Sequence, residues 1–365
     1  MMPPLPTLIL QDMTAMDIVY LDFETRSTVD LKKTGLHKYA SDSSTEIMCM
    51  GYAFGDEAVE LWIPKQGLRS LEKLTKHIEA GKTVVAHNAA FEIAIWNSCL
   101  GCLGLPEIKI NQVTCTMAMS YAMALPGSLE GAAAGAGIKK QKDLAGGRIM
   151  LQLSKPKSIL GGEVVWHEDP EKYKRMYEYC KQDVEVEREL FKRLLKLSDR
   201  EREVWELDFE INNRGVYVDR EAIEAANELI EFEKVRLTKR IQEVSGNQIA
   251  TPNAITQMAN YLRSRGVYVE DLGKASVTEL LKKDLPSDCR EILLIRQEAA
   301  KASTAKLDSI LGSVAHDGRI RGLFQYHGAG TGRWAGRRVQ LQNLPRPNLK
   351  QDEIENVIET IRRIK

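Results

Sequence analysis

The sequence predicts an α/β fold in the first half of the chain and a mostly helical fold behind it. Up to about residue 198, short apolar runs bounded by turn residues are mixed with amphipathic stretches, and beyond it long, charged amphipathic stretches dominate. The expected domains are an α/β domain at residues 16–198, a helical region at residues 199–317, and a third unit at residues 318–365 that opens with an extended segment.

Strands and helices are both expected in the first domain. The apolar run Ile18–Phe23 predicts a buried strand, and Gly55-Asp56 is a turn signal between two later strands. The further expected elements are the strands Ile47–Phe54, Ala58–Ile63 and Thr83–Ala86 and the helices Leu68–Glu79 and Ala89–Leu100. The rest, to about Leu197, is expected to be mostly helical.

The second region is expected to consist of amphipathic helices. Arg220–Val244 and Asp288–Leu311 have helical spacing, and Thr251-Pro252 predicts the start of another helix, with threonine as the cap. From Gly318, the segment GRIRGLFQYHG predicts extended structure.

Composition narrows the class of protein but not its ligand. Of 365 residues, 43% are hydrophobic and 28% are charged, and the formal net charge is zero, which neither favours nor excludes nucleic acid, because binding needs only a local basic surface. Cys99 and Cys102 form a lone CxxC without further zinc ligands nearby, which favours reduced thiols. Without a signal peptide or a run of about 18 apolar residues, the chain is expected to be cytoplasmic and not embedded in a membrane.

Carboxylates follow two of the predicted strands. Asp22 and Glu24 stand two residues apart at the end of the first strand, so their side chains point to the same face, roughly 7 Å apart. Glu92 follows the strand Thr83–Ala86, in the first turn of a predicted helix, where the helix dipole alone would favour a carboxylate. Taken singly, each of these acids has an ordinary structural explanation.

A tyrosine and an aspartate complete the set. Tyr179 and Asp183 are four residues apart in a predicted helix and therefore share a face. Hard oxygen ligands of this kind suit Mg²⁺ or Mn²⁺, and two such ions can activate water and stabilise the leaving oxygen of a phosphodiester. The ordered set of four carboxylates and one tyrosine therefore predicts a two-metal hydrolytic site.

Three segments resemble a known family of nucleases. DFET, HNAAFE and YCKQD are similar to the three exonuclease motifs of the DEDD superfamily, tyrosine subclass, which is built on a ribonuclease H-like mixed sheet. The resemblance implies that Asp22, Glu24, Glu92 and Asp183 bind the metals, with Glu92 in place of the usual aspartate. It further implies that Tyr179 positions the attacking water. Asn88 is expected to help hold a single-stranded 3′ end.

The second half resembles the polymerase region of family A DNA polymerases. REREVWELDFEINNRGVYVD is similar to the start of that region, and GLFQYHGAGTGRWAGRRVQLQNLPRP to its TGR and QNLPR motifs. The arginines also form a basic cluster suited to phosphate. The resemblance implies that the helical region is thumb-like and that a primer-template contacts Arg333, with Gln342 and Asn343 at the nascent base pair. The expected DNA-binding residues beside Asn88 are Arg333, Arg337, Arg338, Gln342, Asn343 and Arg346.

The final residues resemble no catalytic palm. The acids after Arg346 lie on a predicted amphipathic helix whose apolar face comprises Ile354, Val357, Ile358 and Ile361. We therefore expect a truncated palm, and polymerisation only with a separate palm-and-fingers polypeptide.

The favoured function is a 3′→5′ DNA exonuclease, the proofreading half of a polymerase in DNA replication. The alternatives are a non-catalytic DNA-binding subunit or remnant and a ribonuclease D-like RNA exonuclease, against which the polymerase-like second half argues.

Overall fold

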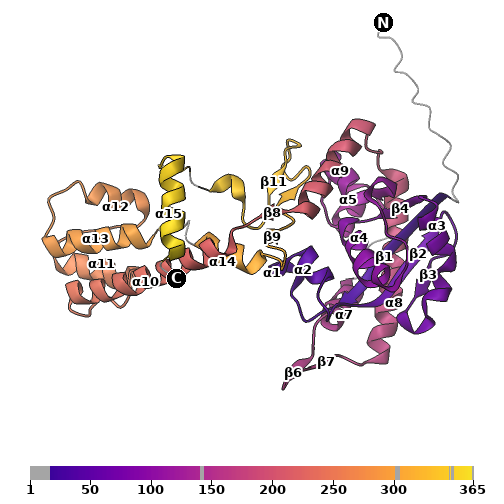
Figure 1. The fold of residues 1–365 in the computed structure, drawn as a ribbon, viewed down its shortest axis with the longest axis horizontal. Coiled ribbons are helices and arrows are strands. Elements are labelled where there is room, and N and C mark those ends of the chain that lie inside the picture. The colour runs from indigo at the N-terminus through magenta and orange to yellow at the C-terminus, as the bar shows by residue number, and fades with distance from the viewer. Residues whose placement is uncertain (1–16, 140–143, 301–304, 345, 347–348, 364–365) are drawn as a thin grey trace, which may run out of the picture. The chain divides into compact units, whose positions relative to one another are not determined.

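The computed structural model describes residues 17–139, 144–300, 305–344, 346 and 349–363. The chain divides into two compact units (Figure 1). The first comprises residues 1–216 and 319–338, and the second comprises residues 217–318 and 339–365.

A five-stranded mixed sheet forms the centre of the first unit, in the order β3-β2-β1-β4-β5. Its central strand β1 runs antiparallel to β2 and parallel to β4. The strands are β1 (Ile18–Arg26), β2 (Glu46–Phe54), β3 (Glu60–Trp62), β4 (Thr83–Ala86) and β5 (Val113–Cys115). The predicted α/β class and the four predicted strands are confirmed, and β5 was not predicted.

Helices surround the strands in the sequence. They are α1 (Leu31–Thr34), α2 (Leu36–Ala40), α3 (Glu72–Glu79), α4 (Ala90–Ile95), α5 (Thr116–Ala122), α6 (Leu129–Gly135), α7 (Leu144–Leu153), α8 (Pro170–Arg193) and α9 (Asp199–Arg214). Of these, α8 and α4 pack on the sheet. A hairpin of β6 (Ser158–Leu160) and β7 (Glu163–Val165) precedes α8. The helix predicted at Ala89–Leu100 is α-helical only to Ile95 and continues as a π-helix over Trp96–Leu100.

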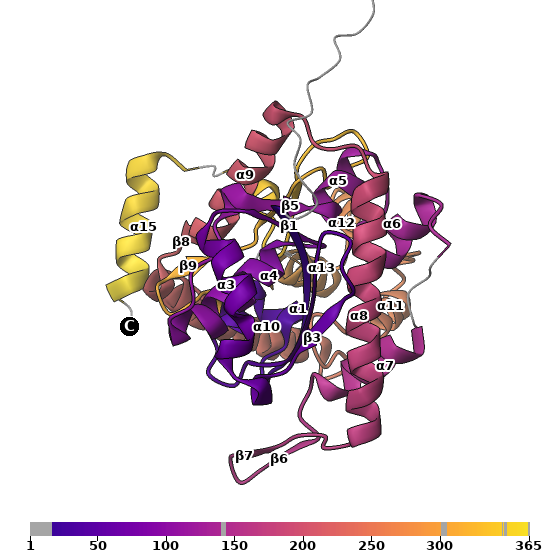
Figure 2. The same cartoon turned by 90° about the vertical axis from the view of Figure 1, so that its right-hand side faces the viewer.

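The longest of these helices, α8, lies against β1 and β2 (Figure 2). Its start follows from local chemistry, since Asp169 accepts a hydrogen bond from the backbone N–H of Lys172 and Pro170 occupies the first turn. Alternation along β1 sends Val19, Leu21 and Phe23 into one hydrophobic cluster and Tyr20 into another, which it shares with residues of α8. Asp22 and Glu24, which have the same parity as Tyr20, are therefore directed to the face of the sheet that α8 covers.

The division into units differs from the expected domain boundaries at residues 198/199 and 317/318. Helix α9 belongs to the first unit, where Trp205 and Tyr326 join the cluster around β1 and the hydroxyl of Tyr326 bonds to Glu201 at 2.7 Å. Residues 319–338 also belong to that unit, with short strands β9 (Arg319–Ile320), β10 (Phe324–Gln325) and β11 (Ala335–Gly336).

The second unit is helical, as predicted. Its helices are α10 (Arg220–Ser245), α11 (Ile255–Ser264), α12 (Lys274–Leu280), α13 (Ser287–Ala299), α14 (Ala305–Ser313) and α15 (Gln351–Arg363), and β8 is the two-residue strand Val216–Tyr217 at the unit boundary. The expectation of one helix at Asp288–Leu311 was wrong, because α13 ends at Ala299 with a cap at Ala300. Helix α11 starts at Ile255, three residues after Pro252.

The predicted amphipathic helix near the end of the sequence is α15, and it packs against α10. Its residues Ile354, Ile358 and Ile361 are half-buried, whereas Val357 is exposed. Among the residues that the structure describes, no helix combines the length and the apolar character needed to cross a membrane.

Candidate active site

Three carboxylates from two elements converge at the end of β1. Asp22 and Glu24 lie on the strand, and Asp183 lies on α8. One oxygen atom from each of the three lies within 4.8 Å of the others. Glu24 and Asp183 are buried and Asp22 is half-buried. The structure thus brings together three of the five residues predicted to carry the chemistry.

A glycine on the neighbouring strand allows this convergence. Gly51 on β2 pairs with Asp22 across the sheet. A Cβ atom at Gly51 would lie 3.0 Å from Cγ2 of Val184 and 3.3 Å from the carbonyl oxygen of Cys180, both on α8. Because no side chain stands there, α8 approaches the sheet closely opposite Asp22. The thiol of Cys180 in turn donates to the backbone oxygen of Asp22 at 3.6 Å.

Tyr179 lies one helical turn before Asp183 and is only 1% exposed. A Cβ atom at Gly147 would lie 3.7 Å from the ring, so α7 packs over it. Burial raises the pKa of the Tyr179 phenol well above its usual value, and the charges of Asp183 and Glu24 raise it further. The phenol therefore stays protonated and can act as a hydrogen-bond donor but not as a base.

Glu92 lies in the first turn of α4, the helix that follows β4. This strand is parallel to β1, with Val85 opposite Tyr20, so the carboxyl ends of both strands lie at the same edge of the sheet. Glu92 is 4% exposed, and its Oε2 has no hydrogen-bond partner among the described residues. Burial raises the pKa of Glu92 well above its usual value, and the charge of Asp22 adds to this. Glu92 is not a member of the 4.8 Å group formed by the other three carboxylates.

The turn between β4 and α4 is tied down on several sides. The two ring nitrogens of His87 bond to the hydroxyl of Thr116 and the carbonyl oxygen of Gly127, both at 2.9 Å. Asn88 is exposed and has a φ of 66°, a left-handed conformation that asparagine tolerates better than most residues. The turn therefore presents the Asn88 side chain to solvent next to the helix that carries Glu92.

A fifth carboxylate, Glu187, was missed in the sequence. It lies one helical turn after Asp183 on α8 and is 1% exposed. Its Oε2 accepts a hydrogen bond from the backbone N–H of His87 at 2.8 Å. Burial, followed by the charges of Asp22 and Glu92, raises the pKa of Glu187 well above its usual value. The only signal in the sequence was its spacing from Asp183, which Glu185 and Glu189 obscure because they make the segment look like a solvated helix face.

The chain resembles known polymerases over most of its length. No protein-family model matches it. It is 34% identical over 351 residues to the DNA polymerase of Bacillus phage SP02, a match that covers 94% of this chain and 52% of that protein. The chain is therefore similar to a DNA polymerase, as the resemblance of its motifs to the family A enzymes implied. It spans about half the length of the phage relative (52%).

A solved structure is similar to this chain at the level of the fold. The POL domain of Pol1 from M. smegmatis, in complex with DNA primer-template and dNTP, superposes with a TM-score of 0.53 at 15% identity. The match covers 90% of this chain and 52% of that one. At this identity the likeness shows the fold alone.

The predicted DNA-binding residues of the present chain are divided between its two units. Arg333 and Arg337 are exposed in the first unit. Gln342, Asn343 and Arg346 are exposed in the second, where Asn343 Nδ2 donates to Gln340 Oε1 at 2.9 Å.

Arg338 has a different setting from the other arginines of its segment. It is half-buried, its guanidinium lies against Gly35, and it donates to the carbonyl oxygen of Lys33 at 3.3 Å. Burial lowers the pKa of the Arg338 guanidinium. Arg338 therefore ties residues 319–338 to the turn between α1 and α2. The DNA contact expected of Arg338 stays a prediction.

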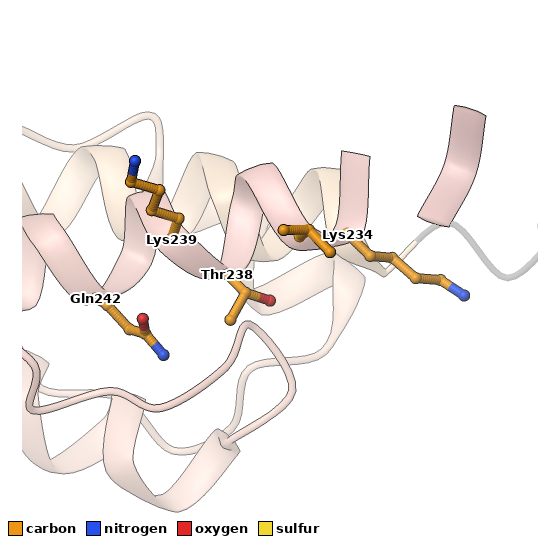
Figure 3. A pocket seen from close by; sticks show the side chains of 5 residues that line it. Lys234, Thr238, Lys239 and Gln242 are labelled. Atoms are coloured by element: carbon orange, nitrogen blue, oxygen red, sulfur yellow. The ribbon is translucent and has the colours of Figure 1, made fainter. Parts of the chain in front are cut away.

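A surface hollow of about 290 Å³ lies on α10, in the second unit of the present chain (Figure 3). Its lining consists of Lys234, Val235, Thr238, Lys239 and Gln242. The lining that these residues form contains no carboxylate, the side chain that divalent cations such as Mg²⁺ usually require.

Proposed function

We propose that the first unit is a metal-dependent 3′→5′ exonuclease that hydrolyses DNA phosphodiester bonds. In this proposal it is the proofreading part of a family A DNA polymerase that acts in DNA replication. The observation that carries it is the meeting of Asp22, Glu24 and Asp183 within 4.8 Å. Carboxylates gathered so closely repel one another, and cations bound between them would remove that cost.

The donor set fits hard divalent cations. All the candidate ligands are carboxylate oxygens, which suit Mg²⁺ or Mn²⁺ better than softer metals. Two buried oxygens, Oε2 of Glu92 and Oε1 of Glu187, have no hydrogen-bond partner among the described residues, which is a costly state for a carboxyl group in a protein interior. Asp22, Glu24 and Asp183 would hold one ion, and Asp22 and Glu92 would hold a second. Two ions bound there would lower the pKa of water and stabilise the leaving oxygen of a phosphodiester.

The remaining residues would orient the reactants. Tyr179 stays protonated and would donate a hydrogen bond that fixes the attacking water. Asn88, exposed at the end of β4, would bond to the terminal nucleotide of the strand. The exposed Arg333 and Arg337 would add phosphate contacts in the same unit.

DNA is the substrate that the comparisons favour. The phage relative is a DNA polymerase, and the structural neighbour binds a DNA primer-template. Both matches extend into the second half of the chain, which favours a polymerase-associated nuclease over a ribonuclease D-like enzyme.

The test is the shortening of a 5′-labelled single-stranded oligonucleotide by the purified chain with Mg²⁺ or Mn²⁺. We expect loss of nucleotides from the 3′ end and a fall of several orders of magnitude in Asp22→Ala, because a shared metal ligand is removed. Asp56→Ala, in the exposed turn after β2, is the matched control and should keep the wild-type rate.

Two results would contradict the proposal. Binding of DNA without metal-dependent degradation would favour the non-catalytic DNA-binding alternative. Faster degradation of an RNA oligonucleotide of the same sequence would favour the ribonuclease D-like alternative.

A further inference from the structure

Helix α8 carries a stripe of three polar side chains on the face that packs against β1. Tyr179, Asp183 and Glu187 follow one another at intervals of four residues and so lie on one side of the helix. All three are at least nine-tenths buried, with Glu187 at 1% exposure. The proposed function uses the first two of these residues, and it leaves the third unexplained.

The two oxygens of Glu187 have different surroundings. Oε2 accepts the hydrogen bond from the backbone N–H of His87, 2.8 Å away. Oε1 is buried and has no hydrogen-bond partner among the described residues. A single backbone contact would be satisfied equally well by a neutral amide. The burial of the second oxygen, which has no partner in the described part of the chain, therefore needs another reason.

Glu92 shares this feature, a buried carboxyl oxygen without a hydrogen-bond partner among the described residues. It follows His87 by five residues, on the helix that the turn begins, and its Oε2 is likewise buried without a partner in the described part of the chain. The charges of Asp22 and Glu92 both act on Glu187. Two oxygens without partners, from α4 and α8, therefore stand in the same acidic environment as the half-buried Asp22.

We propose that Glu187 is a ligand of the metal site, and that with Glu92 and Asp22 it holds the second divalent cation. Asp22 then lies between two cations, since it also belongs to the group with Glu24 and Asp183. The inference deepens the proposed exonuclease function and rests on it for the two cation sites, to the second of which it adds Glu187.

The competing explanation is that Glu187 merely accepts the His87 hydrogen bond and holds the β4–α4 turn. Glu187→Gln separates the two explanations, because glutamine keeps the size and the acceptor but removes the charge. Glu189→Gln is the matched control, since Glu189 lies two residues further along the same helix and is exposed. Glu187→Asp is a second variant that keeps the charge but retracts it by one methylene.

The experiment is a calorimetric titration of the full chain with Mn²⁺ in excess thymidine monophosphate, the type of product that the nuclease would release. We expect two bound ions in wild type and in Glu189→Gln. In Glu187→Gln we expect the weaker ion to bind at least about ten-fold less tightly, as for other changes around metal ligands. The Mn²⁺ affinity of Glu187→Asp should lie between those of wild type and Glu187→Gln.

A second measurement guards against loss of folding. The thermal unfolding temperature without metal should not fall in Glu187→Gln, because a buried charge has been removed. The rise in the unfolding temperature of Glu187→Gln on adding Mn²⁺ should be smaller than the rise in wild type. Equal Mn²⁺ binding by Glu187→Gln and wild type, or only one bound ion in wild type, would overturn the inference.

Failure of the inference and failure of the proposed function can be told apart. If wild type degrades DNA and Glu187→Gln binds Mn²⁺ as wild type does, the exonuclease proposal is supported and Glu187 is not a metal ligand. Suppose instead that wild type binds two Mn²⁺ ions, that Glu187→Gln binds one of them less tightly, and that wild type degrades no DNA. This result would support the second cation site and contradict the exonuclease.

Discussion

Replacing Gly51 by alanine should damage the carboxylate site without touching a carboxylate. The added Cβ would lie 3.0 Å from Val184 Cγ2, 3.2 Å from Cys180 Sγ and 3.3 Å from the Cys180 carbonyl oxygen. Carbon atoms at optimal separation are about 3.5–4.0 Å apart, so α8 must move away from β2 by about half an ångström. The carbonyl group belongs to the helix backbone and cannot rotate aside.

The expected cost follows from this crowding. Overpacking a core costs about 1–3 kcal/mol. For a folded unit of about 150–250 residues, each kcal/mol lowers the unfolding temperature by about 2–4 °C, so we expect a decrease of about 2–12 °C. Because Asp183 moves with α8 relative to Asp22 and Glu24, the rate of the proposed exonuclease should fall by up to about 100-fold, the usual effect of misplacing a reacting group by about 1 Å.

Gly101→Ala is the matched control for Gly51→Ala. Gly101 has helical dihedral angles, and its nearest neighbour would be 3.8 Å from an added Cβ, an ordinary contact. This variant should unfold at or above the wild-type temperature and keep the wild-type rate. If Gly51→Ala also keeps both values, the close approach of α8 to β2 is not what assembles the site.

Three further outcomes follow from the same structure. Tyr179→Phe should lower turnover about 10- to 100-fold while Mn²⁺ affinity by calorimetry is unchanged, and an unchanged rate would restrict Tyr179 to packing. Glu92→Asp should keep substantial nuclease activity and Glu92→Gln should not, because the charge matters more than the reach; equal rates for Glu92→Gln and wild type would make Glu92 a helix-end residue. Burial raises the pKa of Asp208 to about 6, partly offset by a hydrogen bond from Asn212, so its ionised form destabilises the fold as pH rises through that value. The full penalty, at most about 3 kcal/mol, is present above pH 6 and disappears near the unfolded pKa of about 3.9, so Asp208→Asn should raise the unfolding temperature more at pH 7.5 than at pH 4.5; an equal change at both values would contradict this.

The sequence predicted the parts of the first unit that have strong local signals. Strand β1 begins with the apolar run Ile18–Leu21, and α8 begins with an aspartate cap followed by proline. Both signals act within a few residues and are read directly. Strand β5, by contrast, has only three residues, Val113–Cys115. It forms because it pairs with β4, and its own composition gives little signal for a strand.

Contacts between distant residues could not be predicted in this way. Arg338 looked like one arginine of a basic cluster, but it packs against Gly35, about 300 positions earlier in the sequence. Gly51 looked like an ordinary strand residue, and only the approach of α8 shows why a side chain would not fit. Such roles are set by tertiary packing, for which a single sequence carries no local pattern.

The arrangement around α8 is easier to explain by a ligand than by stability. Glu24, Glu92, Asp183 and Glu187 are all buried at 6% exposure or less, and burying carboxyl groups beside one another opposes folding. An apolar side chain of similar size at any of these positions would serve the core at least as well. What the four acids share is their nearness to Asp22, the half-buried carboxylate at the end of the central strand. Positive charge bound at that point would turn the cost of burial into binding energy, so added Mn²⁺ should stabilise the fold in proportion to the number of these carboxylates that contact it.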